Sequence, residues 1–125
     1  MKILIYEDDA QCAAIFAEIL EQIQPTAEII IDLGEKPMLF HLDDPSYDLI
    51  LSDFTVVLGM QCSWLEQHYD HRLVFVSGYT GTESMRMEKE YVWLRKENID
   101  GLRAFLVQRL QRCREYSEFK LLGVA

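Results

Sequence analysis

The chain has 125 residues, of which 50% are apolar and 26% charged, which predicts one folded domain over residues 1–125 and excludes an intrinsically disordered protein. No apolar run approaches the length of a membrane helix and no signal-peptide pattern opens the chain, so we expect a cytoplasmic protein. The net charge of -9 divides into -12 for residues 1–70 and +3 for residues 71–125, and the acidic half disfavours direct binding to nucleic acid.

The first strand is predicted at residues 2–6, where the run KILIY is rich in β-branched and aromatic side chains. It ends abruptly at three acids, Glu7, Asp8 and Asp9. From residue 10 to 24 the apolar side chains recur at spacings of three and four, which indicates an amphipathic helix with Asp9 as its N-cap. A buried strand is therefore followed at once by a helix.

The next two strands flank a short helix. Residues 27–32, AEIIID, form the second predicted strand, Gly34 marks a turn, and residues 36 to about 42 have a helix-like pattern. The third strand is predicted at residues 47–52, and its apolar run stops at another acid, Asp53.

Strand patterns continue in the second half of the chain, at residues 72–78 and 91–96. The segments 61–69 and 82–90 have room for about two helical turns each, so the third and fourth helices are predicted to be short. A long helix follows, and a tail is predicted over residues 116–125. The inner face of that helix is predicted to carry the apolar residues Ile99, Leu102, Phe105, Leu106, Leu110 and Cys113.

Five strand patterns separated by helix patterns predict an α/β fold, with a doubly wound parallel sheet, helices on both faces and right-handed connections. In such a sheet, ligands bind outside the carboxyl ends of the strands. The polar residues at those ends are therefore the candidate site residues: Glu7, Asp8 and Asp9 after the first strand, Asp53 after the third, Ser77 after the fourth and Lys96 after the fifth.

This set of side chains suits phosphoryl transfer. Clustered carboxylates repel one another unless a hard cation lies among them, and Mg²⁺ prefers carboxylate, phosphate and water oxygens. An attacking carboxylate can form an acyl phosphate, while a lysine and a hydroxyl stabilise the charge on the transferred oxygens. We therefore expect Mg²⁺ as the cofactor and Asp53 as the nucleophile.

Over nearly its full length the chain resembles the receiver domains of two-component response regulators, in the motifs ILIYEDD, YDLILSD, VFVSGY and WLRK. The resemblance implies a flavodoxin-like sheet with the strand order 2-1-3-4-5. It also implies a stand-alone signalling switch, monomeric or weakly dimeric, and not a dedicated enzyme. Such a switch takes a phosphoryl group from a histidine kinase or phosphotransfer protein and changes its surface toward a downstream protein.

The resemblance also assigns the acids of the predicted site. Asp53 matches the phosphoacceptor of the family. Asp8, Asp53 and the main-chain carbonyl of Thr55 match the Mg²⁺ ligands, with Glu7 acting through a water molecule. Asp9 matches a third acid that is frequent in the family but inessential.

The remaining positions of the family's site fall in the second half of the chain. Lys96, Ser77 and Gly78 match the phosphate-binding positions, where the glycine leaves space for the phosphoryl group. Ser77 and Trp93 match the pair of switch residues. Their joint movement would alter the surface that partners recognise.

The chain departs from the family's pattern in two loops. Glu97 follows Lys96 where the family usually has a cis proline, and because a cis bond before a non-proline residue costs about 2.5 to 4 kcal/mol, we expect a trans bond. The segment FTVVLGM, residues 54–60, directly follows Asp53 and lacks the family's usual Met-Pro. The intervals from Asp53 to Ser77 and from Ser77 to Lys96, 24 and 19 residues, are also shorter than usual, which shortens the third and fourth helices.

The sequence is also compatible with two other functions. A pseudo-receiver would keep the fold and bind partners without phosphate, which the missing proline and the short helices favour. A phosphatase of the haloacid dehalogenase type would use a similar strand and nucleophile, but it carries a second acid where this chain has Thr55. Taken singly, Asp53 can simply end a strand, Asp9 can simply cap a helix, and the arginines of the last helix can be solvated or form a basic docking surface.

Overall fold

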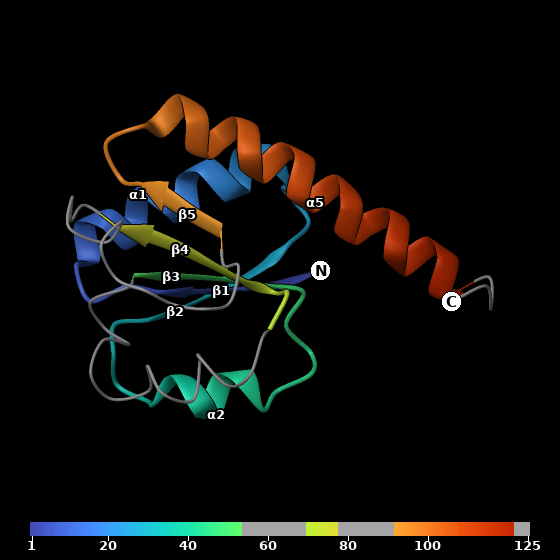
Figure 1. Ribbon diagram of the computed structural model, residues 1–125, viewed down its shortest axis with the longest axis horizontal. Coiled ribbons are helices and arrows are strands. Elements are labelled where there is room, and N and C mark those ends of the chain that lie inside the picture. The colour runs from blue at the N-terminus through green and yellow to red at the C-terminus, as the bar shows by residue number, and fades with distance from the viewer. Residues whose placement is uncertain (54–69, 78–91, 122–125) are drawn as a thin grey trace.

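The structure is a computed structural model that describes residues 1–53, 70–77 and 92–121 (Figure 1). The side chains of Ser77 and of residues 92–95 and 116–121 lie outside the description, as do the predicted third and fourth helices. None of the helices within these ranges combines the length and the apolar composition that crossing a membrane requires.

One sheet of five parallel strands forms the centre of the molecule, in the order β2-β1-β3-β4-β5. Because β1 lies between β2 and β3, the strand order reverses beside it, which is where such folds place their ligands. The predicted fold class, a doubly wound parallel α/β sheet, is confirmed. The strands are β1 (Lys2–Tyr6), β2 (Glu28–Asp32), β3 (Leu49–Asp53), β4 (Leu73–Ser77) and β5 (Val92–Arg95).

Two helices, α1 (Ala10–Ile23) and α5 (Ile99–Leu121), cover one face of the sheet (Figure 1). The central strands are buried on both faces, which explains why their sequences are continuous apolar runs instead of alternating patterns. The core on this face contains Ile3, Ile5, Leu49, Leu51, Val74 and Val76 from the sheet, Phe16 and Leu20 from α1, and Leu102, Leu106 and Leu110 from α5.

The short helix α2 (Met38–Leu42) covers the other face (Figure 1). It begins later than predicted because the Asp32 carboxylate accepts hydrogen bonds from the backbone N–H groups of residues 34–36, which holds them in a turn. Gly34 has a φ of 96° there, as its predicted turn position requires. Met38, Leu42 and Tyr47 pack on Leu4, Tyr6, Ile50 and Phe75 of the sheet.

Helix α5 extends to Leu121, so the segment from residue 116 that we predicted as a tail is largely helical. The physical reason is composition, because the sequence contains neither Gly nor Pro between Gly101 and Gly123 and is rich in helix-forming residues. Figure 1 shows the last turns of α5 projecting past the edge of the sheet. Its first turns carry the predicted inner face, with Ile99 and Phe105 packed against the buried leucines.

Candidate functional site

Two acidic side chains emerge together where the carboxyl ends of β1 and β3 meet. The strands run parallel with Tyr6 opposite Ser52, so the residues that follow, Glu7 and Asp53, lie at the same level of the sheet. Asp8 comes next in the chain, at the start of the turn into α1. The sequence prediction that these three acids meet is thus consistent with the register of the strands.

The carboxylates of Glu7, Asp8 and Asp53 each offer an oxygen within 4.8 Å of the others. Glu7 and Asp53 are only 1% and 4% exposed, whereas Asp8 is exposed to solvent. A hard cation fits this donor set, because it would contact oxygen ligands and offset the repulsion among the carboxylates.

Lys96 supplies the positive charge of this acid cluster. Its ammonium donates a hydrogen bond to Glu7 Oε1 at 3.0 Å and lies 2.9 Å from Oε2 and 3.4 Å from Asp53 Oδ2. Burial raises the pKa of Glu7 to about 7; Asp53 adds to this shift and Lys96 opposes it. Burial by itself would lower the pKa of Lys96, but the two carboxylates outweigh it and the pKa is raised, so the ammonium stays charged.

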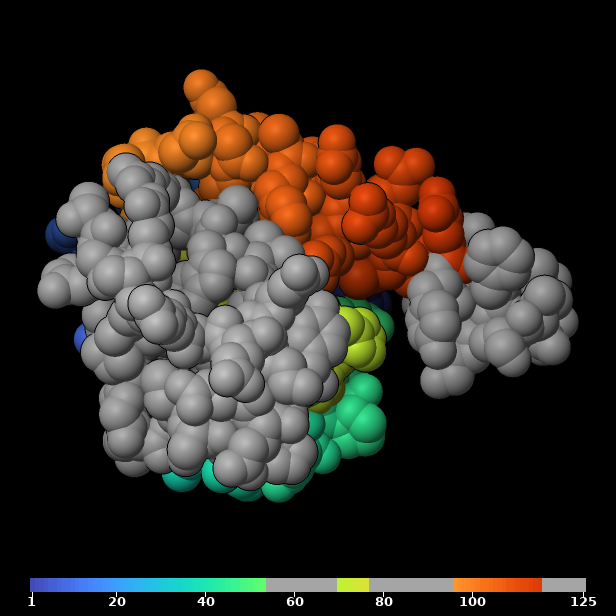
Figure 2. Space-filling model, in the orientation of Figure 1, coloured from blue at the N-terminus to red at the C-terminus, as the bar shows by residue number. Residues whose placement is uncertain are grey.

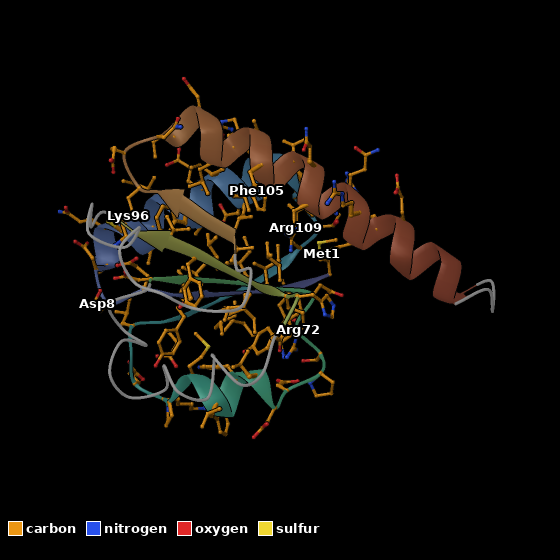
Figure 3. The ribbon with its side chains drawn as sticks, in the orientation of Figure 1. Met1, Asp8, Arg72, Lys96, Phe105 and Arg109 are labelled. Atoms are coloured by element: carbon orange, nitrogen blue, oxygen red, sulfur yellow. The ribbon has the colours of Figure 1, made fainter. Side chains whose placement is uncertain are left out.

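The loop after β5 presents Lys96 without the family's proline. Figure 3 shows Lys96 and Asp8 at the same end of the sheet. The described residues contain no cis peptide bond, so the bond from Lys96 to Glu97 is trans, as we expected. With this trans bond the ammonium still reaches Asp53.

Asp9 caps helix α1, as predicted from its position directly before the helix. Its Oδ1 accepts hydrogen bonds from the backbone N–H groups of Gln11 at 2.9 Å and Cys12 at 3.2 Å. Its own N–H donates to Glu7 Oε1 at 3.1 Å. Asp9 therefore stabilises the first turn of the helix and helps to fix Glu7.

Four other predicted site residues are described in part or not at all. Ser77 is the last residue of β4 and pairs with Arg95, and Trp93 lies in β5 opposite Phe75, but the side chains of Ser77 and Trp93 lie outside the description. Thr55 and Gly78 lie outside the described residues altogether. The roles assigned to these four residues stay predictions.

A buried acid–imidazole pair at the end of β2 was not predicted. His41 Nε2 lies 2.6 Å from Asp32 Oδ2, and the imidazole packs edge-on against Tyr6, Phe40 and Tyr47. Burial alone would raise the pKa of Asp32, but hydrogen bonds from His41 and the backbone outweigh it and the pKa is lowered. An acid just before a Gly turn was visible in the sequence, but no signal linked it to a histidine on the next helix.

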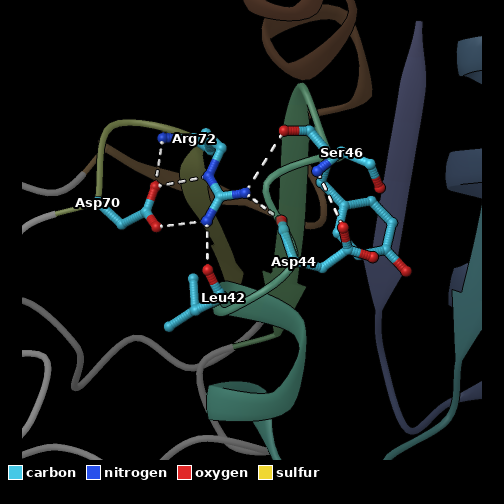
Figure 4. Close-up of polar contacts among 6 residues, drawn as sticks. Leu42, Asp44, Ser46, Asp70 and Arg72 are labelled. Atoms are coloured by element: carbon cyan, nitrogen blue, oxygen red, sulfur yellow. Dashed lines mark hydrogen bonds and ion pairs between the residues drawn. The ribbon is translucent and has the colours of Figure 1, made fainter.

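A second unpredicted feature is Arg72, which directly precedes β4 and lies at the end of the sheet away from Lys96 and Asp8 (Figure 3). Figure 4 shows its polar contacts. Its guanidinium donates to both carboxylate oxygens of Asp70, at 3.0 and 2.8 Å, and to the carbonyls of Leu42 and Asp44, each at 2.7 Å. Arg72 thereby ties the end of α2 and the following loop to the start of β4. A lone charge directly before an apolar run was the only sequence signal for it.

Comparison by sequence finds no protein-family model and no curated protein that matches the chain. Comparison of structures does find matches. The signal receiver domain of the DNA-binding response regulator merR from Colwellia psychrerythraea 34H matches with a TM-score of 0.68 and 21% identity, over 89% of this chain and 98% of that domain.

Two further structures have the same architecture. The N-terminal domain of a response regulator/sensory box/GGDEF protein from Carboxydothermus hydrogenoformans has a TM-score of 0.61 and 23% identity, over 97% of this chain and 99% of its own. The response regulatory domain of mrkE from Klebsiella pneumoniae has a TM-score of 0.60 and 19% identity, over 94% and 98%. The chain therefore has the fold of response regulator receiver domains.

Proposed function

We propose that the chain is a single receiver domain that accepts a phosphoryl group on Asp53 from a histidine kinase or phosphotransfer protein. The observation that carries the proposal is the convergence of Lys96 with Glu7, Asp8 and Asp53 at the carboxyl edge of the sheet. The receiver fold supports it further, since the three structural matches named above are domains of response regulators.

The metal of this proposal is Mg²⁺. Asp8, Asp53 and the main-chain carbonyl of Thr55 would bind it, and Glu7 would contact it through a water molecule. The three clustered carboxylates, each with an oxygen within 4.8 Å of the others, support a cation at this place. When bound, the ion would neutralise charge on the transferred oxygens.

The protein's own residues perform the transfer. A carboxylate oxygen of Asp53 attacks the phosphorus of the donor, the bond from phosphorus to the donor atom breaks, and the donor leaves with that electron pair. Lys96 offsets the negative charge that gathers beside Asp53. Glu7 holds the ammonium in reach, at 2.9 and 3.0 Å, so the lysine needs little reorganisation.

The consequence of phosphorylation would be a change of surface. Ser77 would bind the phosphoryl group with Lys96 beside the space left by Gly78, and Trp93 would move with Ser77. That movement would bias an existing equilibrium between two conformations and so change affinity for a downstream protein. In this role the chain is a cytoplasmic, monomeric or weakly dimeric signalling module of a two-component phosphorelay, not a dedicated enzyme.

The test is phosphorylation of the purified protein by acetyl phosphate with Mg²⁺, read as the mass of the intact protein. The wild type should gain one phosphoryl group, and Asp53→Asn should gain none. Asp9→Asn is the matched control, because it removes a neighbouring acid that caps a helix, and it should keep the adduct. An adduct that survives Asp53→Asn would refute the assignment.

One observation favours a pseudo-receiver as the second candidate. Lys96 already pairs with the buried Glu7, so the cluster has a counter-charge without metal or phosphate. A pseudo-receiver would show no adduct under any of these conditions, and its tryptophan fluorescence would not respond to Mg²⁺. A response to Mg²⁺ together with an adduct would exclude this candidate.

A further inference from the structure

A groove of about 810 Å³ lies between α5 and the segment that joins α2 to β3. Figure 3 shows Arg72 and Arg109 at this end of the sheet, and Asp8 and Lys96 at the other. Figure 2 shows α5, in orange and red, above the yellow and green surfaces of the β4 entry and the α2–β3 segment. The groove is therefore separate from the proposed phosphorylation site.

The wall that α5 contributes is cationic. Arg109 donates a hydrogen bond to the carbonyl of His71 at 2.9 Å, and its guanidinium lies 5.2 Å from the ring of Phe105, so the side chain is held in place. Arg112 lines the groove one turn further along and is exposed. The ion pairs within the described ranges involve neither arginine, so both keep N–H donors suited to a carboxylate.

The floor of the groove is partly apolar and is preformed. Leu42, Pro45 and Tyr47 line it on the α2–β3 side, and Cys113 lines it on the α5 side. Arg72 fixes this segment through its hydrogen bonds to the carbonyls at residues 42 and 44. A ligand would therefore bind without first ordering the loop, which reduces the entropic cost of association.

Acids on the opposite wall determine how an acidic ligand is oriented in the groove. Asp43 is exposed at the rim, and Asp48 lines the same side, where its Oδ2 accepts a hydrogen bond from the N–H of Lys2 at 2.8 Å. A ligand carboxylate is repelled from this wall and attracted to Arg109 and Arg112. An acid on the ligand must therefore face α5.

We propose that this groove binds a short acidic segment of a partner protein, with a carboxylate against Arg109 and Arg112 and an adjacent apolar side chain against the exposed Pro45. Charge complementarity identifies the occupant. Because the protein carries a net charge of -9, an acidic partner is repelled overall, and the arginines of the α5 wall offer local attraction. The inference holds whether or not Asp53 is phosphorylated.

The test uses two end-blocked peptides added to isotopically labelled protein and followed by NMR. In one peptide glutamate alternates with leucine, and in the other glutamine replaces glutamate. The acidic peptide should shift the backbone signals of Tyr47, His71 and Cys113 and bind about tenfold more tightly than its neutral counterpart, as the loss of one charge-assisted hydrogen bond predicts.

Variants locate the contact on α5. Arg112→Glu should weaken binding of the acidic peptide by about tenfold or more, because it replaces attraction with repulsion at an exposed position. The matched control is Arg114→Glu, since Arg114 donates instead to Gln24 at 2.8 Å and is not among the lining residues; it should leave binding unchanged. Asp43→Asn should tighten binding.

Three results would overturn the proposal. Equal affinities for the two peptides would show that charge does not select the ligand. Equal weakening by Arg112→Glu and Arg114→Glu would show that the net charge of the helix matters and not the groove. Concentration-dependent shifts at Tyr47 and His71 in the protein alone would mean that a second copy of the chain occupies the groove.

Discussion

Replacing Arg72 with methionine should destabilise the fold strongly, because one side chain satisfies three separate groups. The guanidinium pairs with both oxygens of Asp70 and donates to the carbonyls of Leu42 and Asp44 (Figure 4). Methionine fills a similar volume but donates no hydrogen bond. The change leaves one carboxylate and two carbonyls without this partner.

The expected loss of unfolding free energy is about 3 kcal/mol. Breaking a buried ion pair by removing one partner costs about 3 to 5 kcal/mol, and each orphaned acceptor about 1 to 3 kcal/mol. The side chains of Arg72 and Asp70 are 13% and 15% exposed, so water reaches the freed groups and the lower end of the range applies. Arg112→Met, on an exposed arginine, is the control and should cost less than about 0.5 kcal/mol.

The assay is unfolding by urea at several pH values. Burial alone would raise the pKa of Asp70, but the hydrogen bonds from Arg72 outweigh it and the pKa is lowered. A lowered carboxyl pKa gives stability that is present above the unfolded value of about 3.9 and is lost as the pH falls through the folded value. The difference between wild type and Arg72→Met should therefore be full at neutral pH and shrink in acid.

Two outcomes would refute this reasoning about Arg72. A loss below about 1 kcal/mol at neutral pH would mean that water replaces the guanidinium at little cost. A loss that stays constant into acid would mean that the pairing with Asp70 contributes nothing, and that the effect comes from packing alone.

Three further predictions concern the carboxyl edge of the sheet. Asp9→Ala should cost about 1 kcal/mol in urea unfolding, and Asp9→Ser should recover most of it, because the cap of α1 is what the side chain provides. His41→Leu should cost about 1 to 3 kcal/mol by the same assay, since it leaves the buried Asp32 carboxylate with one hydrogen bond fewer; an unchanged midpoint would contradict this role. Lys96→Met should raise the affinity for Mg²⁺ on the order of tenfold in calorimetric titration, because it removes a positive charge 2.9 Å from Glu7; a weaker affinity would show that the lysine organises the cation site.

The fold was predictable because its signals are local. The apolar runs of β1 and β3, the Asp9 cap and the Gly34 turn each depend on a few neighbouring residues, and each predicted the structure within a residue or two. The same logic failed at the end of α5. Nothing in the residues after 115 stops a helix before Gly123, and the helix runs to Leu121, into the segment that we predicted as a tail.

The candidate site was predictable in outline because parallel strands bring their carboxyl ends to one edge. That rule alone places Glu7, Asp8 and Asp53 together. It does not say which acids Lys96 will contact, and the structure pairs the lysine with the two buried acids, Glu7 and Asp53. Such pairings depend on burial and on side-chain reach across the sheet, which are not encoded in spacing along the chain.

The contacts of Arg72 and His41 lay beyond sequence reasoning for a similar reason. The residues that Arg72 joins to β4 lie 28 and 30 positions away, and His41 meets Asp32 only because the α2 helix folds back under the sheet. A charge before an apolar run and a histidine in a short helix are common features of surface segments. Only the packing of the elements converts them into fixed hydrogen bonds.

The central claim is that Asp53 forms an acyl phosphate, and chemical trapping tests it most directly. After treatment with acetyl phosphate and Mg²⁺, reduction with borohydride converts an aspartyl phosphate to homoserine, which peptide mass mapping locates. We predict homoserine at position 53 and at no other acid, with Glu7, Asp8 and Asp9 unmodified. Absence of homoserine at position 53, or its appearance at a neighbouring acid in its place, would contradict the account.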